Sequence, residues 1–518
     1  MNHWIIAPVL LPALVAAIII LVLRYQVITQ RVFSVASTVA LIGIGIGLLV
    51  HSMSGQIDVY ELGNWPAPFG IVLVLDRLSA MMVLLTAVLA LAVVLYAIGS
   101  GWDKRGHHFH ALFQFQLMGI FGAFLTGDAF NLFVFFEVLL IASYGLMIHG
   151  GGAVRLRAGV QYVVYNLLGS TLFFFALGTI YAVTGTLNMA DLAVRVADLP
   201  ASDTAMIRVA AVLLLLVFAV KAALIPLHFW LPATYAEAPA PVAALFAVMT
   251  KIGAYAIIRI YTLVFGTDVA ATADMIGPWL LAGAIVTLVV GMIGVLGASH
   301  LGRLAAFAAI GSMGTLLIAI ALFTPQAITA ALYYMIHSTL AGAALFLVVD
   351  MVRARRVAED DAIAPRPAIV QNGLVAAYFF AAAIAMAGMP PLSGFLGKLL
   401  VLDAVRDHAL VWLIWATILA TSLVAVMGFA RAGSLVFWNV APEVDHTPAP
   451  HPQTALTFVA TGGLIAAIAM LTVFAGPVTT FLSETSAQVF DKQSYIAAVL
   501  ETARAIEVEN MPLEGSQK

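Results

Sequence analysis

The sequence predicts an all-α polytopic membrane protein with about 14 transmembrane helices. Of its 518 residues, 63% are hydrophobic and only 9% are charged, which excludes an ordinary soluble domain. A spanning helix needs about 20 apolar residues, and roughly fourteen such segments lie between Ile5 and Phe474. Short polar links join them, so a single membrane-embedded unit is expected.

The helices are predicted from apolar runs that end at polar or turn residues. Beyond them, the tail from Ala475 to Lys518 is more polar, and its segment AAVLETARAIEVENM is expected to form an amphipathic helix on the outer surface. The predicted helices begin near residues 5, 33, 79, 110, 129, 159, 208, 241, 278, 303, 327, 371, 409 and 454.

Charged residues in the links predict the orientation. Basic residues occupy alternate links and acidic residues the intervening ones, with Arg195 as the exception. Because basic links stay inside, both termini are expected outside. The basic links hold Arg24, Arg31, Lys104, Arg105, Arg155, Arg157, Arg303, Arg353, Arg355 and Arg356; the acidic links hold Asp58, Glu61, Asp191, Asp198, Asp203, Asp268 and Asp274.

Two predicted helices contain helix breakers. In VFAVKAALIPLHFWLP, Pro226 removes a backbone donor and clashes with the preceding turn. In MAGMPPLSGFLGKLLVL, Pro390 and Pro391 have the same effect. Broken helices at membrane depth must be buried in protein or line a wet cavity, and this pair predicts two inverted repeats of five helices. The expected divisions are 1–106 (three N-terminal helices), 107–265 and 266–438 (the repeats), and 439–518 (last helix and tail).

Five ionisable side chains lie deep in the predicted helices: Glu137, Lys221, Lys251, His337 and Lys398. A charged residue at a helix centre costs about 2.5–3.5 kcal/mol on insertion scales. Such residues are therefore functional hypotheses by default. We predict that these five carry proton transfer and charge-pair switching.

Alternatives exist for several of these residues. A Glu137–Lys221 pair is either a switch or a structural salt bridge. Lys221 and Lys251 lie on successive antiparallel helices, and two nearby ammonium groups in a low dielectric favour a proton relay. Snorkelling to an interface is the alternative for Lys251 and the expected role of Arg259. His337 titrates near neutral pH, or it is a satisfied core residue.

Other polar residues carry weaker expectations. Asp76 and Asp128 are predicted helix N-caps, and Asp128 could also open the outer mouth of a path. The histidines of His107–His110 are expected to be exposed at the membrane–water interface without a metal. The segment 312–314 is expected to serve packing, and His228, past the first break, is a candidate exit group.

Cysteine is absent. Structural disulfides, thiolate-held iron–sulfur clusters and cysteine-ligated zinc are therefore not expected. We expect no cofactor and no metal in this chain, and no basic block indicates nucleic acid. Any redox centre would lie on another subunit.

Four motifs resemble the fourteen-helix antiporter-like subunits shared by Mrp-type multisubunit cation/proton antiporters and respiratory complex I. The resemblance covers nearly the whole chain and is strongest to the D-type subunits of Mrp antiporters. It implies proton transfer at the five buried residues given above. The motifs are GDAFNLFVFFEVLLIASYGL around Glu137, VKAALIPLHFWLPATYAEAPAPVAAL around Lys221, VMTKIGAYAIIR around Lys251 and GMPPLSGFLGK ending at Lys398.

The resemblance implies a subunit of a sodium/proton antiporter, driven by the proton motive force, in a prokaryotic cell membrane with other membrane subunits as partners. It implies a secondary transporter and not an enzyme. Two alternatives are a proton-pumping subunit of a respiratory NADH dehydrogenase or membrane-bound hydrogenase, and a scaffold without transport of its own. Sodium prefers oxygen ligands, and this chain has few buried carboxylates. The residues themselves therefore argue mainly for proton transport.

Overall fold

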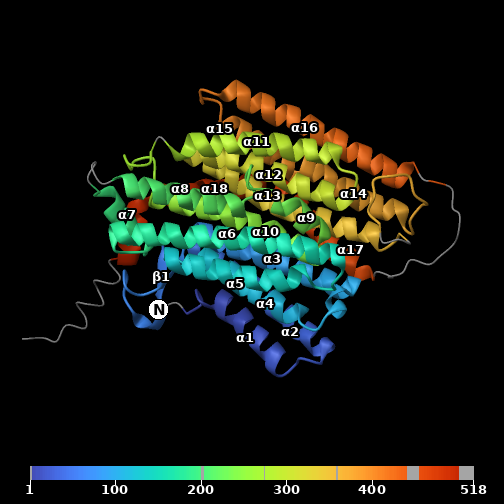
Figure 1. The fold of residues 1–518 in the computed structure, drawn as a ribbon, viewed down its shortest axis with the longest axis horizontal. Helices are drawn as coiled ribbons and strands as arrows, with labels where there is room; N and C mark the ends of the chain where they lie inside the picture. Colours follow the sequence, from blue (N-terminus) through green and yellow to red (C-terminus); the bar gives the residue numbers. More distant parts are fainter. Residues whose placement is uncertain are drawn as a thin grey trace, which may run out of the picture.

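Most helices of the computed structural model run along its long axis, so their ends gather at two opposite ends of the molecule (Figure 1). The structure describes residues 3–199, 204–273, 275–356, 360–439, 441 and 454–500. Among them, eleven helices are long and apolar enough to cross a membrane. With three shorter apolar helices they make the fourteen that the sequence predicts.

The spanning helices begin within six residues of their predicted starts. The eleven long helices are α2 (Val27–Ser52), α3 (Arg77–Ser100), α5 (Ala129–Met147), α6 (Ala153–Thr184), α8 (Thr204–Lys221), α10 (Ala240–Leu263), α11 (Ile276–Gly297), α12 (Leu301–Ala321), α13 (Pro325–Arg353), α16 (Val411–Gly433, with a π-helical turn at Ser434–Trp438) and α17 (Ala455–Val473). The shorter apolar helices are α1 (Ala7–Leu21), α4 (Phe109–Leu125) and α14 (Asn372–Ala387). The remaining helices are α7 (Met189–Ala197), α9 (Trp230–Glu237), α15 (Ser393–Ala404) and α18 (Ala475–Phe490), with 3₁₀ turns at Leu62–Asn64 and Trp102–Arg105.

One element departs from the predicted all-helical chain. Strands β1 (Asp58–Glu61) and β2 (Val72–Leu75) form an antiparallel hairpin between α2 and α3. The β2 sequence VLVL is rich in β-branched side chains, which favour strands, and all four residues are buried. The link between α2 and α3 is therefore partly a small sheet.

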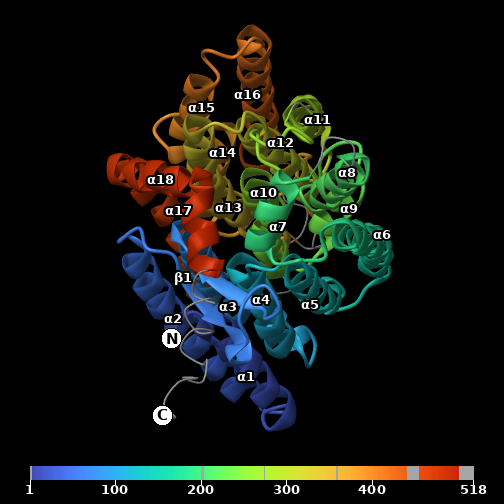
Figure 2. The same cartoon turned by 90° about the vertical axis from the view of Figure 1, so that its left-hand side faces the viewer.

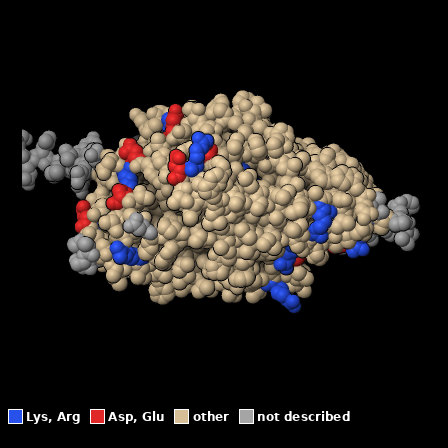
Figure 3. Space-filling view, turned by 90° about the horizontal axis from the view of Figure 1, so that it is seen from above, with Lys and Arg blue, Asp and Glu red and all other residues tan. Residues whose placement is uncertain are grey.

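The two ends of the bundle differ in charge. The end formed by the hairpin, α7 and the start of α8 carries Asp58, Glu61, Asp191 and Asp268, and we call it the acidic end. The opposite end, with Trp102–Arg105 and the C-terminus of α13, is called the basic end. Figure 3 shows charged side chains toward both ends and an uncharged band between them, as a bilayer requires.

The separation of basic from acidic residues between the two ends is weaker than the sequence of the links predicts. Besides Arg195, the acidic end carries Arg208, which donates to the Ala271 carbonyl, and Arg406, which pairs with Asp403. Lys492 pairs with Asp268 there as well. The placement of the acidic end outside the cell remains a prediction.

Both predicted breaks are present, and they run in opposite directions. The chain passes from the acidic end along α8, breaks after Lys221, and continues as α9 toward the basic end. The second segment starts at the basic end as α14, breaks after Ala387, and continues as α15 toward the acidic end. This inversion agrees with the predicted fold class, whereas the exact division at residues 107–265 and 266–438 stays a prediction.

Helices α10 and α13 occupy the centre of the bundle, between α1 and α2 on one side and α11 and α16 on the other (Figure 2). Every residue of α10 is buried. The tail helix α18 lies at the acidic end, where Glu484 pairs with Arg77 and Ser486 donates to the Pro325 carbonyl. Residues 492–500 are also helical. The part of the predicted amphipathic segment beyond residue 500 lies outside the described residues.

Candidate functional site

Helices α8 and α10 approach each other closely beside the first break. A Cβ atom on Gly253 of α10 would lie 2.8 Å from the Phe218 carbonyl oxygen and 3.1 Å from the Lys221 Cβ atom, so only glycine fits. This contact places Lys221 opposite the segment that carries Lys251. Both lysines are buried, with 6% and 2% of their surface exposed.

The two ammonium groups nevertheless contact different helices. The Lys221 Nζ atom donates to the Asn166 Oδ1 atom of α6 at 2.8 Å and lies 5.7 Å from the centre of the Phe136 ring. The Lys251 Nζ atom lies 3.3 Å from the Met313 Sδ atom of α12. Met313 therefore contacts a candidate site residue, although we expected the segment 312–314 to serve only packing. The two lysines are neighbours along the backbone but do not share an acceptor.

Glu137 and Lys221 are connected through α6. Glu137 is half-buried on α5 and accepts a hydrogen bond from Ser170. Ser170 lies one turn along α6 from Asn166, the partner of Lys221. Among the described residues, no ion pair within 4.0 Å joins Glu137 to Lys221. Glu137 and Lys221 are therefore not in direct contact. Each is hydrogen-bonded to an uncharged α6 side chain instead, Glu137 to Ser170 and Lys221 to Asn166.

The first break is closed by protein groups. Ala223 adopts a left-handed φ of 54°, and the Leu224 N–H donates back to the Ala219 carbonyl. The Val220 carbonyl accepts a hydrogen bond from the Trp230 indole at 3.0 Å. His228, in the same break, is buried, and its Nδ1 atom has no partner among the described residues.

The second break joins His337 and Lys398. The Lys398 Nζ atom donates to the carbonyl of Ala387, the last residue of α14, at 2.7 Å and to the Ser422 hydroxyl at 2.8 Å. The His337 Nδ1 atom lies 2.9 Å from the Ser393 hydroxyl at the start of α15. Thus α13, α14, α15 and α16 all contribute to one polar cluster. The structure brings these two predicted residues to the same break.

Four polar partners of the predicted residues were not anticipated from the sequence: Asn166, Ser170, Ser393 and Ser422. Asn166 and Ser170 had a detectable signal, because their spacing of four places both on one face of a spanning helix. Ser393 follows the Pro390–Pro391 break directly. Ser422 carried no comparable signal, since serine is common in membrane helices and packs readily.

Arg259 is not a snorkelling anchor. Only 5% of its surface is exposed, and its Nη1 atom lies 2.6 Å from the Asp76 Oδ2 atom. The prediction was wrong because Asp76 begins α3 beside the end of α10, so a carboxylate is available inside the protein. Asp76 also caps α3 by accepting from the Ser79 N–H, as predicted.

Asp128 is confirmed as the N-cap of α5. Its Oδ1 atom accepts from the Asn131 N–H at 2.8 Å. Asp128 is 8% exposed, and burial raises the pKa of its carboxyl to about 6. A carboxyl group with this pKa can bind and release a proton near neutral pH.

The His107–His110 run is only partly exposed. His107 and His108 are exposed as predicted, but His110 is buried, with its Nε2 atom 3.2 Å from Asp103 and its Nδ1 atom 3.0 Å from Ser34. Burial opposes the charge of Asp103, yet hydrogen bonds from His110 and Arg31 outweigh it and lower the pKa of that carboxyl. The buried histidine fixes a basic-end loop.

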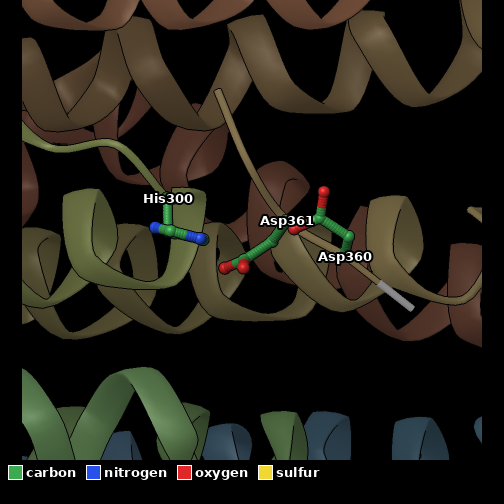
Figure 4. Close-up of side chains that lie close together, drawn as sticks. All are labelled: His300, Asp360 and Asp361. Atoms are coloured by element: carbon green, nitrogen blue, oxygen red, sulfur yellow. The ribbon is translucent and has the colours of Figure 1, made fainter. Parts of the chain in front are cut away.

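Three side chains of metal-ligating types meet at the basic end: His300, Asp360 and Asp361, whose ligand atoms lie within 4.8 Å of one another (Figure 4). Both carboxylates already have cationic partners, since Asp361 pairs with Arg353 and Asp360 pairs with Arg366. Asp361 also accepts from the Gly302 N–H at 2.7 Å. A cation would compete with these arginines, so the cluster is better suited to tying a loop to α12 and α13.

Comparison with known proteins defines the class. Residues 126–425 match the family model described as NADH:quinone oxidoreductase/Mrp antiporter, transmembrane region. A curated relative from Bacillus subtilis, named as the D subunit of a Na⁺/H⁺ antiporter, is 38% identical over 96% of this chain and 100% of its own length. One from Rhizobium meliloti, named as the D subunit of a probable K⁺/H⁺ antiporter, is 37% identical over 98% of this chain and 99% of its own. The chain therefore belongs to the family of D-type subunits of Mrp-type cation/proton antiporters.

Solved structures share the fold. A chain in the Mrp complex from Dietzia sp. DQ12-45-1b matches with a TM-score of 0.86 and 27% identity, over 96% of this chain and 100% of that one. A chain of an archaeal membrane-bound sulfane sulfur reductase matches with a TM-score of 0.85 and 25% identity, over 96% and 99%. Respiratory complex I from Thermus thermophilus matches at 22% identity with a TM-score of 0.78, over 96% of this chain and 99% of that one, which shows the fold alone.

Proposed function

We propose that this chain carries protons across a prokaryotic cell membrane as one subunit of a multisubunit sodium/proton antiporter. One observation supports the proposal most directly. The ammonium groups of Lys221, Lys251 and Lys398 are buried, and in the hydrogen bonds between described residues they contact only uncharged acceptors. A lysine on an uncharged acceptor can lose its proton without leaving an unpaired carboxylate behind.

The five predicted residues then have distinct roles. Lys221 and Lys251 relay protons in the first half of the chain, and His337 and Lys398 do so around the second break. Glu137 acts with Lys221 as the charge-pair switch, through Ser170 and Asn166 on α6. Water is needed between the groups, because the hydrogen bonds between the described residues do not join them into a continuous chain.

The transported cation, the partner subunits and the direction of proton movement are inferred from similarity to the relatives. Relatives named for Na⁺/H⁺ and for K⁺/H⁺ are about equally similar, so the similarity supports sodium without separating it from potassium. We propose that other membrane subunits of the same complex supply the cation path, because the lysine ammonium groups here cannot coordinate a cation. Protons would enter from outside, driven by the proton motive force.

A redox-driven proton pump is the second candidate, because the sulfane sulfur reductase chain matches this fold as well as the Mrp chain does. Sequence favours the antiporter, since antiporter relatives reach 37–38% identity over nearly the whole chain. The two candidates differ in what copurifies with the chain. Iron–sulfur or flavin absorbance in the purified native complex would support the redox pump.

The test uses the complete complex reconstituted into vesicles, with internal pH followed after addition of sodium or potassium. In the Lys221→Ala and Glu137→Ala variants, the rate of cation-dependent proton movement is expected to fall at least about 10-fold. Lys104→Ala, which removes an exposed basic-end lysine, is the matched control and should transport normally. Intact transport in both test variants, in normally assembled complexes, would favour the scaffold hypothesis.

A further inference from the structure

A line of polar side chains continues from Lys251 to the acidic end of α10. Tyr255 and Arg259 follow Lys251 at intervals of four residues, so all three lie along one side of the helix. Eight residues of helix span about 12 Å. All three side chains are buried.

Tyr255 and Arg259 are bonded to each other. The Tyr255 hydroxyl donates to the Phe124 carbonyl at 2.6 Å and accepts from the Arg259 Nη2 atom at 3.3 Å. The Arg259 guanidinium carbon lies 5.5 Å from the Tyr255 ring centre and 5.4 Å from that of Tyr495. The guanidinium therefore lies against two aromatic rings and is neutralised by Asp76.

The line ends at Asp128. Tyr495 is 4% exposed, and its hydroxyl has no hydrogen-bond partner among the described residues. This hydroxyl lies 3.2 Å from the place that a Cβ atom of Gly127 would occupy, next to Asp128 in the chain. An unpartnered buried hydroxyl is costly, so this one indicates a site where water or a proton carrier is accommodated.

We propose that protons pass between Asp128 and Lys251 along this side of α10, with Tyr255 as the hydroxyl link and the Asp76–Arg259 pair as the gate. The proposal rests on the proposed function and adds the acidic-end branch of its path. Asp128 binds a proton from solvent and releases it toward the Tyr495 hydroxyl. Water and the Tyr255 hydroxyl pass it to the neutral amine of Lys251, which becomes an ammonium. Every step moves one proton and needs no other reactant.

The gate follows from the fixed charge of arginine. A guanidinium stays protonated and would repel an excess proton in a low dielectric. With Asp76 at 2.6 Å the pair is neutral overall, so proton passage depends on the pair staying together. A purely structural role for the pair would require nothing of the Tyr255 hydroxyl beyond its hydrogen bonds to Phe124 and Arg259.

A matched pair of variants on α10 separates these roles. Tyr255→Phe removes the hydroxyl of the proposed path. Tyr261→Phe removes another buried hydroxyl, which donates to the Ala211 carbonyl at 2.5 Å on the side facing α8. In vesicles with the complete complex, Tyr255→Phe should slow cation-dependent proton movement about 10-fold, and Tyr261→Phe should stay within about twofold of the wild type. Equal effects in the two variants would overturn the proposal.

Asp128 supplies a readout that a structural role would not change. Among the described residues, the titratable group beside it is Tyr495, which in turn faces the Asp76–Arg259 pair. In the wild type, the rate should depend on pH near 6 when the acidic-end side is titrated, and Asp128→Asn should flatten that dependence. Asp198→Asn, at an exposed acidic-end position, should leave it unchanged. A retained pH dependence in Asp128→Asn contradicts the path, whereas a wild-type complex without any cation-dependent proton movement contradicts the proposed function itself.

Discussion

The two interrupted helices share a proline break and a buried lysine, but they use them differently. Their chain directions are opposite, and Lys221 precedes its break whereas Lys398 follows its own. Both lysines therefore lie on the acidic-end side of their breaks. Counted along the helices, Lys221 is roughly 25 Å from the acidic-end start of α8, and Lys398 is roughly 9 Å from the acidic-end terminus of α15. The two lysines therefore do not occupy equivalent positions on their helices.

The two lysines also differ in what holds them. Lys221 is held by a side chain, Asn166, while the indole of Trp230 satisfies the carbonyl freed by the break. Lys398 itself satisfies the carbonyl at its break, that of Ala387. At the first break, therefore, one residue bonds the freed carbonyl and a different residue bonds the lysine. At the second break, the ammonium group of Lys398 both closes the break and is held by it.

The largest expected effect comes from giving either lysine a carboxylate partner. Asn166→Asp would place a negative charge at the 2.8 Å contact with Lys221, and Ser422→Asp would do so for Lys398. A buried ion pair holds the proton on lysine, so proton movement should fall at least about 10-fold in each variant.

The controls for these variants are Asn166→Gln and Ser422→Thr, which keep an uncharged acceptor and should lose less. Vesicle transport of the assembled complex provides the measurement. Unimpaired transport in Asn166→Asp would show that Lys221 does not need to release its proton.

Stability should distinguish the two breaks. Lys398→Ala and Trp230→Phe each leave a buried carbonyl with one hydrogen bond fewer, which costs about 1–3 kcal/mol. Lys221→Ala removes a buried charge without freeing a backbone carbonyl, and its loss of stability should be smaller than that of Lys398→Ala. Thermal unfolding of the purified complex in detergent measures the difference. Equal losses in the two lysine variants would mean that Lys398 does not close its break.

A smaller effect is expected from the histidine of the second break. Ser393→Ala removes the hydroxyl 2.9 Å from the His337 Nδ1 atom, so the ring loses the bond that orients it. Proton movement should fall about fivefold, since a hydrogen bond makes a net contribution of about 1 kcal/mol, which corresponds to about a fivefold change in rate. Ser338→Ala is the control on α13, because the Ser338 hydroxyl donates to the Met335 carbonyl of its own helix. If both serine variants behave alike, the Ser393 contact has no special part in transport.

Much of the fold was predictable because a bilayer imposes long apolar helices and makes buried charges conspicuous. The fourteen helices, both breaks, the Asp76 and Asp128 caps and the burial of the three lysines follow from such local patterns. What the sequence could not reveal depends on contacts distant along the chain. Arg259 pairs with Asp76, 183 positions earlier in the sequence. Ser170 and Asn166 reach Glu137 and Lys221 only because α6 packs against α5 and α8. The β hairpin was missed because its strands are short and lie in a link.

The last prediction concerns orientation and should leave transport unchanged. Because the chain lacks cysteine, a single introduced cysteine is the only site in this chain for a maleimide. Thr267→Cys at the acidic end and Lys104→Cys at the basic end replace exposed residues. In right-side-out vesicles, a membrane-impermeant maleimide should label the first and not the second, because basic links remain inside. The opposite pattern would place both lysines on the inner side of their breaks, and the branch through Asp128 would then open to the cytoplasm.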